Sequence, residues 1–149
     1  MGATKRRSDG ATKGRSNHIL GKGYKVMKSA VKTFRDLVAW QKGKELSKVV
    51  YVVTRRMPED ERFGLTNQMR RASVSIPSNI AEGHARQSRA DYLKHPRISR
   101  GSLAELMTQV EIAWELELMP FDQRLNELLK EEDRILQALI RSLENKGRA

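Results

Sequence analysis

Apolar side chains recur at helical spacing along most of this chain, most clearly between residues 65 and 83. That stretch reads LTNQMRRASVSIPSNIAEG, and its apolar positions fall at steps of four, three, four and four: Leu65, Met69, Ala72, Ile76 and Ile80. Side chains spaced in this way lie on one side of an α-helix. The stretch therefore predicts a helix with one buried stripe.

Pro77 falls inside this stripe, where a proline removes a backbone donor and crowds the carbonyl four residues back. We expect a kinked but continuous helix in which Ser73 and Ser75 bond the freed carbonyl. The alternative, a break at residues 75–76 after which Pro77 starts a new helix, stays open at this point. Gly43, in an earlier helical stretch, is a position where another helix can approach closely.

Similar stripes and end signals predict four helices, at residues 33–56, 59–85, 89–118 and 121–145. Thr33 with Asp36, and Ser88 with Asp91, have the spacing of helix-capping boxes. Pro96 stands seven residues past the start of the third helix, so we expect that helix to bend or break there. Short connections between long helices favour antiparallel neighbours. The sequence thus predicts an all-α fold, an antiparallel up-down-up-down four-helix bundle over residues 33–146.

The first 32 residues differ from the rest in composition. Residues 1–33 contain nine Lys or Arg and one Asp, a net charge of +8, with few large apolar side chains. Such a segment buries too little apolar surface to order itself, so we predict a basic, poorly ordered extension, weakly helical near its end. Two readings stay open: an arm that binds phosphate without sequence preference, and an extension from an upstream start codon.

The net charge of the whole chain is +11, and it is unevenly placed. Residues 62–100 contain eight basic and two acidic side chains, whereas residues 101–149 contain six basic and ten acidic ones. This asymmetry favours an anionic partner for one part of the bundle, against the simpler reading of ordinary surface arginines. The candidate nucleic-acid-binding residues lie around the end of the second helix and the start of the third: Arg70, Arg71, Arg86, Arg89, Lys94, Arg97 and Arg100.

Aromatic side chains are scarce in this basic region, with Tyr92 as the exception. Stacking of single bases on aromatic rings is therefore disfavoured. Recognition of backbone shape in a structured RNA is the expected mode.

Catalytic and metal-binding patterns are absent from the sequence. It has no cysteine, no Glu or Asp three residues before a histidine, and no phosphate-binding or nucleophile motif. We expect no enzymatic activity, no cofactor and no metal, with His84 and His95 at the surface or in loops. Asn79 and Glu82 share one side of the second helix and are expected to form a structural polar network with an arginine such as Arg71.

Membrane and secretion signals are also missing. No apolar run approaches the length of about 18 residues that a membrane-spanning helix needs, and no apolar stretch follows the basic N-terminus as in a secretory signal. We expect a cytoplasmic protein.

Several apolar residues fall outside the predicted core stripes and are candidates for a contact between subunits. They are Val52, Val74, Leu116 and Met119.

Three sequence blocks resemble a known family. FRDLVAWQKGKEL (34–46), QMRRASVSIPSNIAEG (68–83) and RISRGSLAELMTQVEIA (97–113) occur in the order found in the 23S rRNA-intervening-sequence proteins, which are four-helix bundles. The resemblance covers roughly residues 34–143. His95 and Pro96 depart from the family, which usually has an apolar or aromatic pair there. Ser102 resembles the small residue at which helices of the family pack closely.

Relatives of that family include the accessory variability determinants of diversity-generating retroelements. These are basic, pentameric bundles that bind a reverse transcriptase and its RNA. The resemblance therefore implies a homo-oligomeric ring, most often a pentamer, with a reverse transcriptase as one candidate partner.

Together these observations predict a non-enzymatic, oligomeric accessory protein that binds structured RNA or RNA–DNA. The alternative from another class is a protein-interaction scaffold without nucleic-acid affinity. The sequence argues against a hydrolase or metal enzyme built on Glu82 and His84.

Overall fold

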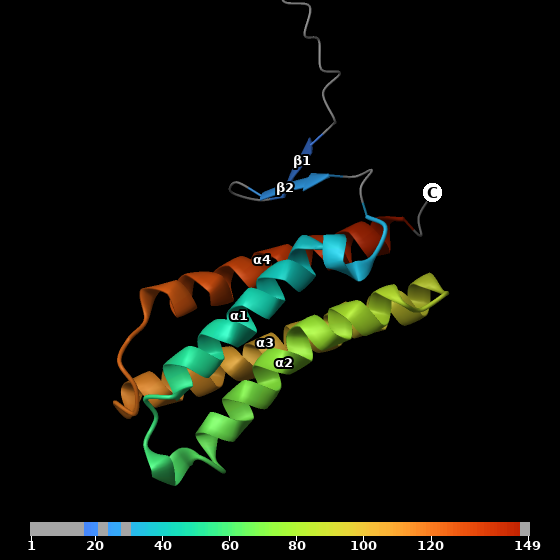
Figure 1. Cartoon of the computed structure of the whole chain (residues 1–149). Coiled ribbons are helices and arrows are strands. Elements are labelled where there is room, and N and C mark those ends of the chain that lie inside the picture. The colour runs from blue at the N-terminus through green and yellow to red at the C-terminus, as the bar shows by residue number, and fades with distance from the viewer. Residues whose placement is uncertain (1–16, 21–23, 28–30, 147–149) are drawn as a thin grey trace, which may run out of the picture.

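The computed structural model describes residues 17–20, 24–27 and 31–146. Four α-helices make up most of this part: α1 (Val38–Thr54), α2 (Leu65–His84), α3 (Arg89–Glu115) and α4 (Gln123–Asn145). The α1–α2 and α3–α4 connections lie at one end of the bundle, and the tight α2–α3 turn lies at the other (Figure 1). The predicted all-α four-helix bundle is confirmed.

Two short strands precede the bundle. β1 (Asn17–Leu20) and β2 (Tyr24–Met27) pair antiparallel, with Asn17 opposite Met27 and Leu20 opposite Tyr24. The sequence pattern predicted no strand here and weak helix at most, so at these positions the backbone differs from the prediction. The rest of the basic extension, residues 1–16, 21–23 and 28–30, lies outside the described residues.

The first two helices begin later than predicted. The Thr33–Asp36 capping box forms, but it caps a 3-10 turn at Phe34–Asp36, and the extended residue Leu37 separates that turn from α1. Likewise the acidic residues after Pro58 form a 3-10 turn at Glu59–Glu61, and α2 starts only after Gly64. Local capping signals therefore start a turn in both places without starting the long helix.

The later helix limits are closer to the prediction. Ser88 caps α3 through the amide of Asp91, and Asp122 caps α4 through the amide of Leu125. α3 ends at Glu115 rather than at residue 118, and α4 begins at Gln123 rather than at 121.

Pro77 does not interrupt α2, which runs without a break from Leu65 to His84. The carbonyl that the proline leaves free is that of Ser73, and it accepts a hydrogen bond of 2.7 Å from the hydroxyl of Ser47 on α1. The prediction that Ser73 or Ser75 would bond this carbonyl is wrong, because the donor comes from the neighbouring helix. Gly43, one turn before Ser47, lies against the proline ring, and a Cβ there would be in van der Waals contact with Pro77 at 3.4 Å.

α3 is also continuous through its proline, so of the predicted bend or break near Pro96 the break does not occur. The proline and His95 are buried against Gly83 of α2, where a Cβ would lie 2.8 Å from the Cβ of His95. Further along the same pair of helices, Ser99 donates to the carbonyl of Ile76 at 2.8 Å. The pairing of small residues with prolines thus brings α1, α2 and α3 close together.

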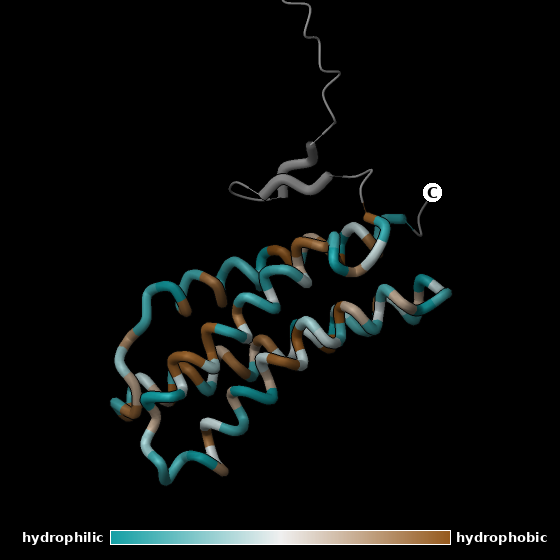
Figure 2. The backbone as a smooth tube through the Cα atoms, in the orientation of Figure 1, coloured by the Kyte–Doolittle hydropathy of each residue, from teal (hydrophilic) through white to brown (hydrophobic). Residues whose placement is uncertain are grey.

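The core lies on the inward sides of all four helices, and apolar and polar positions alternate along each of them (Figure 2). Met119, expected at the surface, belongs to this core, while Val52, Val74 and Leu116 are exposed as predicted. None of the helices in the described residues is both long and apolar enough to span a membrane.

Candidate nucleic-acid interface

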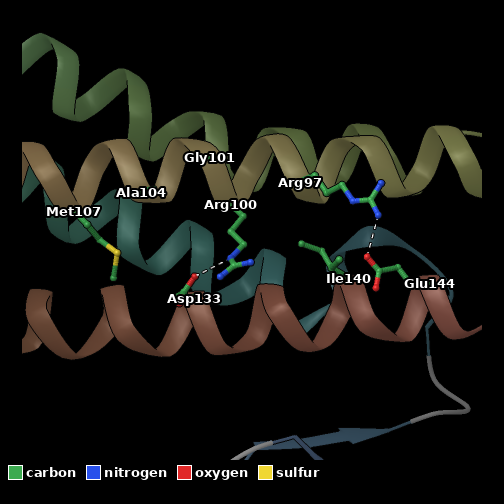
Figure 3. A pocket seen from close by; sticks show the side chains of 8 residues that line it. All are labelled: Arg97, Arg100, Gly101, Ala104, Met107, Asp133, Ile140 and Glu144. Carbon is green, nitrogen blue, oxygen red and sulfur yellow. Dashed lines mark hydrogen bonds and ion pairs between the residues drawn. The ribbon is translucent and has the colours of Figure 1, made fainter.

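The seven predicted nucleic-acid-binding residues do not share one surface. Arg70 lies on the α1 side of α2, where its Nε donates to Thr54 Oγ1 at 2.9 Å and its guanidinium stacks 4.7 Å from the centre of the Tyr51 ring. Arg97 and Arg100 extend instead from α3 toward α4 (Figure 3). The basic region of the sequence is therefore divided between different sides of the bundle.

Three of the seven are engaged by carboxylates. Arg86 pairs with Glu82 at 2.6 Å, one helical turn away. Arg97 pairs with Glu144 at 2.9 Å and Arg100 with Asp133 at 3.2 Å, both across the α3–α4 seam. In the part of the chain that the structure describes, the other three exposed cations have no carboxylate within 4.0 Å: Arg71, Arg89 and Lys94.

A groove of about 580 Å³ runs between α3 and α4, and we call it the α3–α4 groove. Figure 3 shows the two ion pairs spanning it, with Met107 and Ile140 beside them. Its walls come from both helices: Arg97, Arg100, Gly101, Ala104 and Met107 on α3, and Asp133, Ile140 and Glu144 on α4.

The two ion pairs of the groove are open to solvent. Arg97 and Arg100 are 55% and 50% exposed. Pairs of this kind contribute about 0–1 kcal/mol, because water and salt screen both charges. The two carboxylates therefore hold these arginines only weakly.

The outward side of α4 carries a second row of cations beside the groove, which we call the α4 row. It consists of Lys130, Arg134 and Arg141, all exposed, and none has a carboxylate within 4.0 Å among residues 31–146. The spacing of four and seven residues places them on one side of the helix, opposite the buried leucines. Sequence reasoning missed this row because the net charge of residues 101–149 is acidic, although the spacing itself was visible.

Asn79 and Glu82, the two residues of the predicted polar network, both lie close to His95 of α3. Asn79 Oδ1 lies 3.3 Å from Nδ1 of His95, and that nitrogen lies 3.8 Å from Glu82. The arginine of the network is Arg86, not Arg71. His95 is buried in α3, so the expectation of a surface or loop histidine is wrong for this residue.

Glu132 is a buried acid that the sequence analysis did not single out. It is fully buried in α4, and neither carboxylate oxygen has a hydrogen-bond partner in the described structure. Burial raises the pKa of this carboxyl well above its ordinary value of 4.5, and the nearby Glu131 raises it further. Its position within the leucine stripe, three residues after Leu129 and four before Leu136, was the available signal.

Titratable groups elsewhere form no metal-binding set. Among the described residues, no three His, Asp or Glu side chains come together in a way that would hold a metal ion. The geometry of this part of the molecule is thus one of charged surfaces around a packed core.

The comparisons with known proteins agree with this architecture. The family model of the 23S rRNA-intervening sequence protein matches residues 35–141. The chain belongs to this family. A search of curated proteins gives no match.

A solved relative shows the same fold as this family member. The crystal structure of a protein of unknown function from the S23 ribosomal protein family of Bacteroides thetaiotaomicron superposes with a TM-score of 0.64 at 24% sequence identity. The alignment covers 69% of this chain and 98% of that one. At this level of identity the comparison concerns the fold alone.

Proposed function

We propose that this family member is a non-enzymatic, oligomeric accessory protein of the cytoplasm that binds structured RNA or an RNA–DNA hybrid. The observation that carries the proposal is that the α4 row lies beside the arginines of the α3–α4 groove. Two parallel rows of cations on neighbouring helices offer phosphate contacts along and across one surface. Contacts of this kind give affinity without sequence reading.

The ion pairs of the groove fit this role. Both pairs are open to solvent, so the guanidinium groups of Arg97 and Arg100 remain accessible to a phosphate. A phosphate that displaces an exposed carboxylate exchanges one charged partner for another at small cost. Aromatic rings are not part of this surface, which supports recognition of backbone shape over base stacking.

Assembly would multiply such contacts. We propose a homo-oligomer, a pentamer in the arrangement that the family resemblance implies, in which each copy presents the same surface to one RNA. Several weak sites on one scaffold bind far more tightly than one, because binding after the first contact is intramolecular.

A finer proposal makes the protein the accessory subunit of a diversity-generating retroelement reverse transcriptase. Its support is the family resemblance. The neighbouring genes test it: a reverse transcriptase gene with paired template and variable repeats is the expected finding, and a gene embedded in an rRNA insertion would contradict it.

RNA binding is tested with a labelled RNA hairpin and fluorescence anisotropy at increasing salt concentration. The test variant carries Lys130→Gln, Arg134→Gln and Arg141→Gln. The control carries Arg35→Gln, Arg56→Gln and Arg62→Gln, which remove the same charge from exposed positions before and after α1. Both proteins keep the basic N-terminal extension, so its contribution cancels.

We expect the α4-row variant to bind at least about tenfold more weakly than the control and to lose about one unit of salt slope for each lost phosphate contact. Equal losses in the two variants would overturn the assignment of this surface. Absence of binding by the unmodified protein at low salt would overturn RNA binding itself and leave the protein-interaction scaffold.

A further inference from the structure

The outward side of α1 carries basic and apolar residues together, and we call it the α1 face: Lys44, Lys48, Tyr51, Val52 and Arg55. Val52 is 56% exposed and Tyr51 is 42% exposed. The one acidic residue of α1, Glu45, is turned toward α4, where it pairs with Arg124 at 2.8 Å. The three cations of the face therefore have no carboxylate within 4.0 Å in the described residues.

The outward side of α3 has the complementary composition in its second half, and we call it the α3 face: Glu105, Thr108, Ile112, Glu115 and Leu116. Leu116 is 64% exposed and Ile112 is 42% exposed. Both glutamates are exposed, and neither has a cation within 4.0 Å among residues 31–146. Exposed apolar residues bordered by unpaired charges of one sign are typical of an interaction surface.

The two faces also match in spacing. Adding 60 or 61 to the residue numbers of the α1 face gives those of the α3 face, so that Lys44 corresponds to Glu105, Val52 to Ile112 and Arg55 to Glu115. Because both faces are helical, Lys44, Val52 and Arg55 lie within one residue's rise of the level of Glu105, Ile112 and Glu115 when the helices run parallel, whereas Lys48 lies level with the uncharged Thr108.

The fold supplies that parallel direction. α1 and α3 run the same way in an up-down-up-down bundle, and each of them packs against α2 and α4, so they occupy opposite corners (Figure 1). When copies are related by rotation about an axis along the bundle, α1 of one copy is parallel to α3 of the next. Contacts between two different faces of this kind close into rings or extend into filaments.

We propose that the α1 face of one copy docks in parallel on the α3 face of a second copy. Lys44 then lies beside Glu105 of the partner's face, Arg55 lies beside Glu115, and Val52 packs on Ile112. This inference rests on the oligomeric part of the proposed function and adds the surfaces that form the contact. The α4 row takes no part in it and remains open to RNA.

Charge reversal tests the docking. One variant carries Lys44→Glu and Arg55→Glu, which make both faces acidic; a second carries Glu105→Lys and Glu115→Arg, which make both faces basic. The mass of each full-length protein is measured by light scattering and sedimentation velocity, alone and in an equimolar mixture. A third protein carries all four substitutions, and the matched control carries Lys130→Glu and Arg134→Glu on α4.

We expect the unmodified protein and the control to assemble. Each two-substitution variant alone should fail to assemble. Assembly should be restored in the mixture of the two variants and in the four-substitution protein. All substituted residues are exposed, so circular dichroism should give folded spectra for every variant. A monomeric unmodified protein, unchanged masses in both reversed variants, or failure of the mixture and of the four-substitution protein to assemble would each overturn the docking. None of these results depends on RNA, so a failure of RNA binding is recognised separately.

Discussion

The hydroxyl of Ser47 on α1 bonds the backbone carbonyl of Ser73 on α2 at 2.7 Å. That carbonyl is the one for which Pro77 provides no amide partner, four residues further along α2. The proline and the serine that compensates for it are thus 30 positions apart in sequence and lie on different helices. Both ends of the bond are buried.

Replacing Ser47 by alanine should destabilise the bundle. Without the hydroxyl, the carbonyl of Ser73 is left buried with neither an amide nor a side-chain donor, which costs about 1–3 kcal/mol. Urea unfolding monitored by circular dichroism measures the change. Ser78→Ala, at an exposed position of α2, is the control and should stay within about 0.5 kcal/mol of the unmodified protein. A similarly small effect of Ser47→Ala would contradict the role of the hydroxyl.

Two glycines inside helices should respond to alanine in opposite directions. At Gly83 a Cβ would lie 2.8 Å from the Cβ of His95 and 3.0 Å from the carbonyl oxygen of Tyr92, neither of which moves easily. At Gly101 nothing lies within 4 Å. Thermal unfolding should show Gly83→Ala destabilised by about 1–3 kcal/mol through overpacking. Gly101→Ala should be stabilised by up to about 1 kcal/mol through helix propensity. Changes of the same sign would refute the close approach of α2 to α3.

Glu132 should make the free energy of unfolding depend on pH. Its pKa is raised in the folded protein, so the unfolded chain releases this proton at a lower pH than the folded one. Stability from this residue is fully present below pH 4.5 and is lost as the pH rises from there toward the folded pKa. Glu132→Leu removes both the titration and the unpartnered oxygens.

The leucine variant should therefore be more stable than the unmodified protein, and the difference should widen between pH 5 and pH 8. Urea unfolding across this range measures it. Glu127→Gln, an exposed position on the same helix, should show a constant difference. A pH-independent difference for Glu132→Leu would mean that the carboxyl titrates normally.

Removing the carboxylates of the α3–α4 groove should strengthen RNA binding. Asp133 and Glu144 compete with phosphate for Arg100 and Arg97, and the exposed pairs stabilise the fold by no more than about 1 kcal/mol each. Anisotropy should show Asp133→Asn with Glu144→Gln binding an RNA hairpin several-fold more tightly, with little change in unfolding. Glu59→Gln with Asp60→Asn, which change the net charge equally in the α1–α2 connection, should give a smaller gain. Weaker binding by the groove variant would argue that the ion pairs position the arginines productively.

The helices could be predicted from sequence because the signals that specify them, apolar spacing and capping residues, lie within each helix or next to it. Apolar spacing located all four, and the capping residues Ser88 and Asp122 fixed the starts of α3 and α4 within two residues. The starts of α1 and α2 were missed because a capping box and a proline also suit a single 3-10 turn. The effect of Pro96 was misjudged for a different reason. The proline fits into a continuous α3 because it packs against Gly83, which lies on another helix.

The candidate surface was harder to predict than the fold. Arg97 and Arg100 were named from their spacing, but their partners on α4 are 47 and 33 positions away, respectively, and only packing brings them close. Lys130, Arg134 and Arg141 were hidden by a regional charge count, since all the acids of α4 except Glu127 lie on other sides of the helix. A plot of the charged residues of α4 by their angle around the helix axis would have identified this row.

Pro77, Gly43 and Ser47 also determine how α1 and α2 can move against each other. A slide by one turn would carry the serine hydroxyl about 5 Å from the carbonyl that needs it. In one direction it would also bring Ser47 itself against the proline ring, where only glycine now stands. A slide of this kind would break a buried hydrogen bond, so the observed register of α1 on α2 is favoured. That register also sets how far apart, along the bundle axis, the outward charges of α1 and α2 lie.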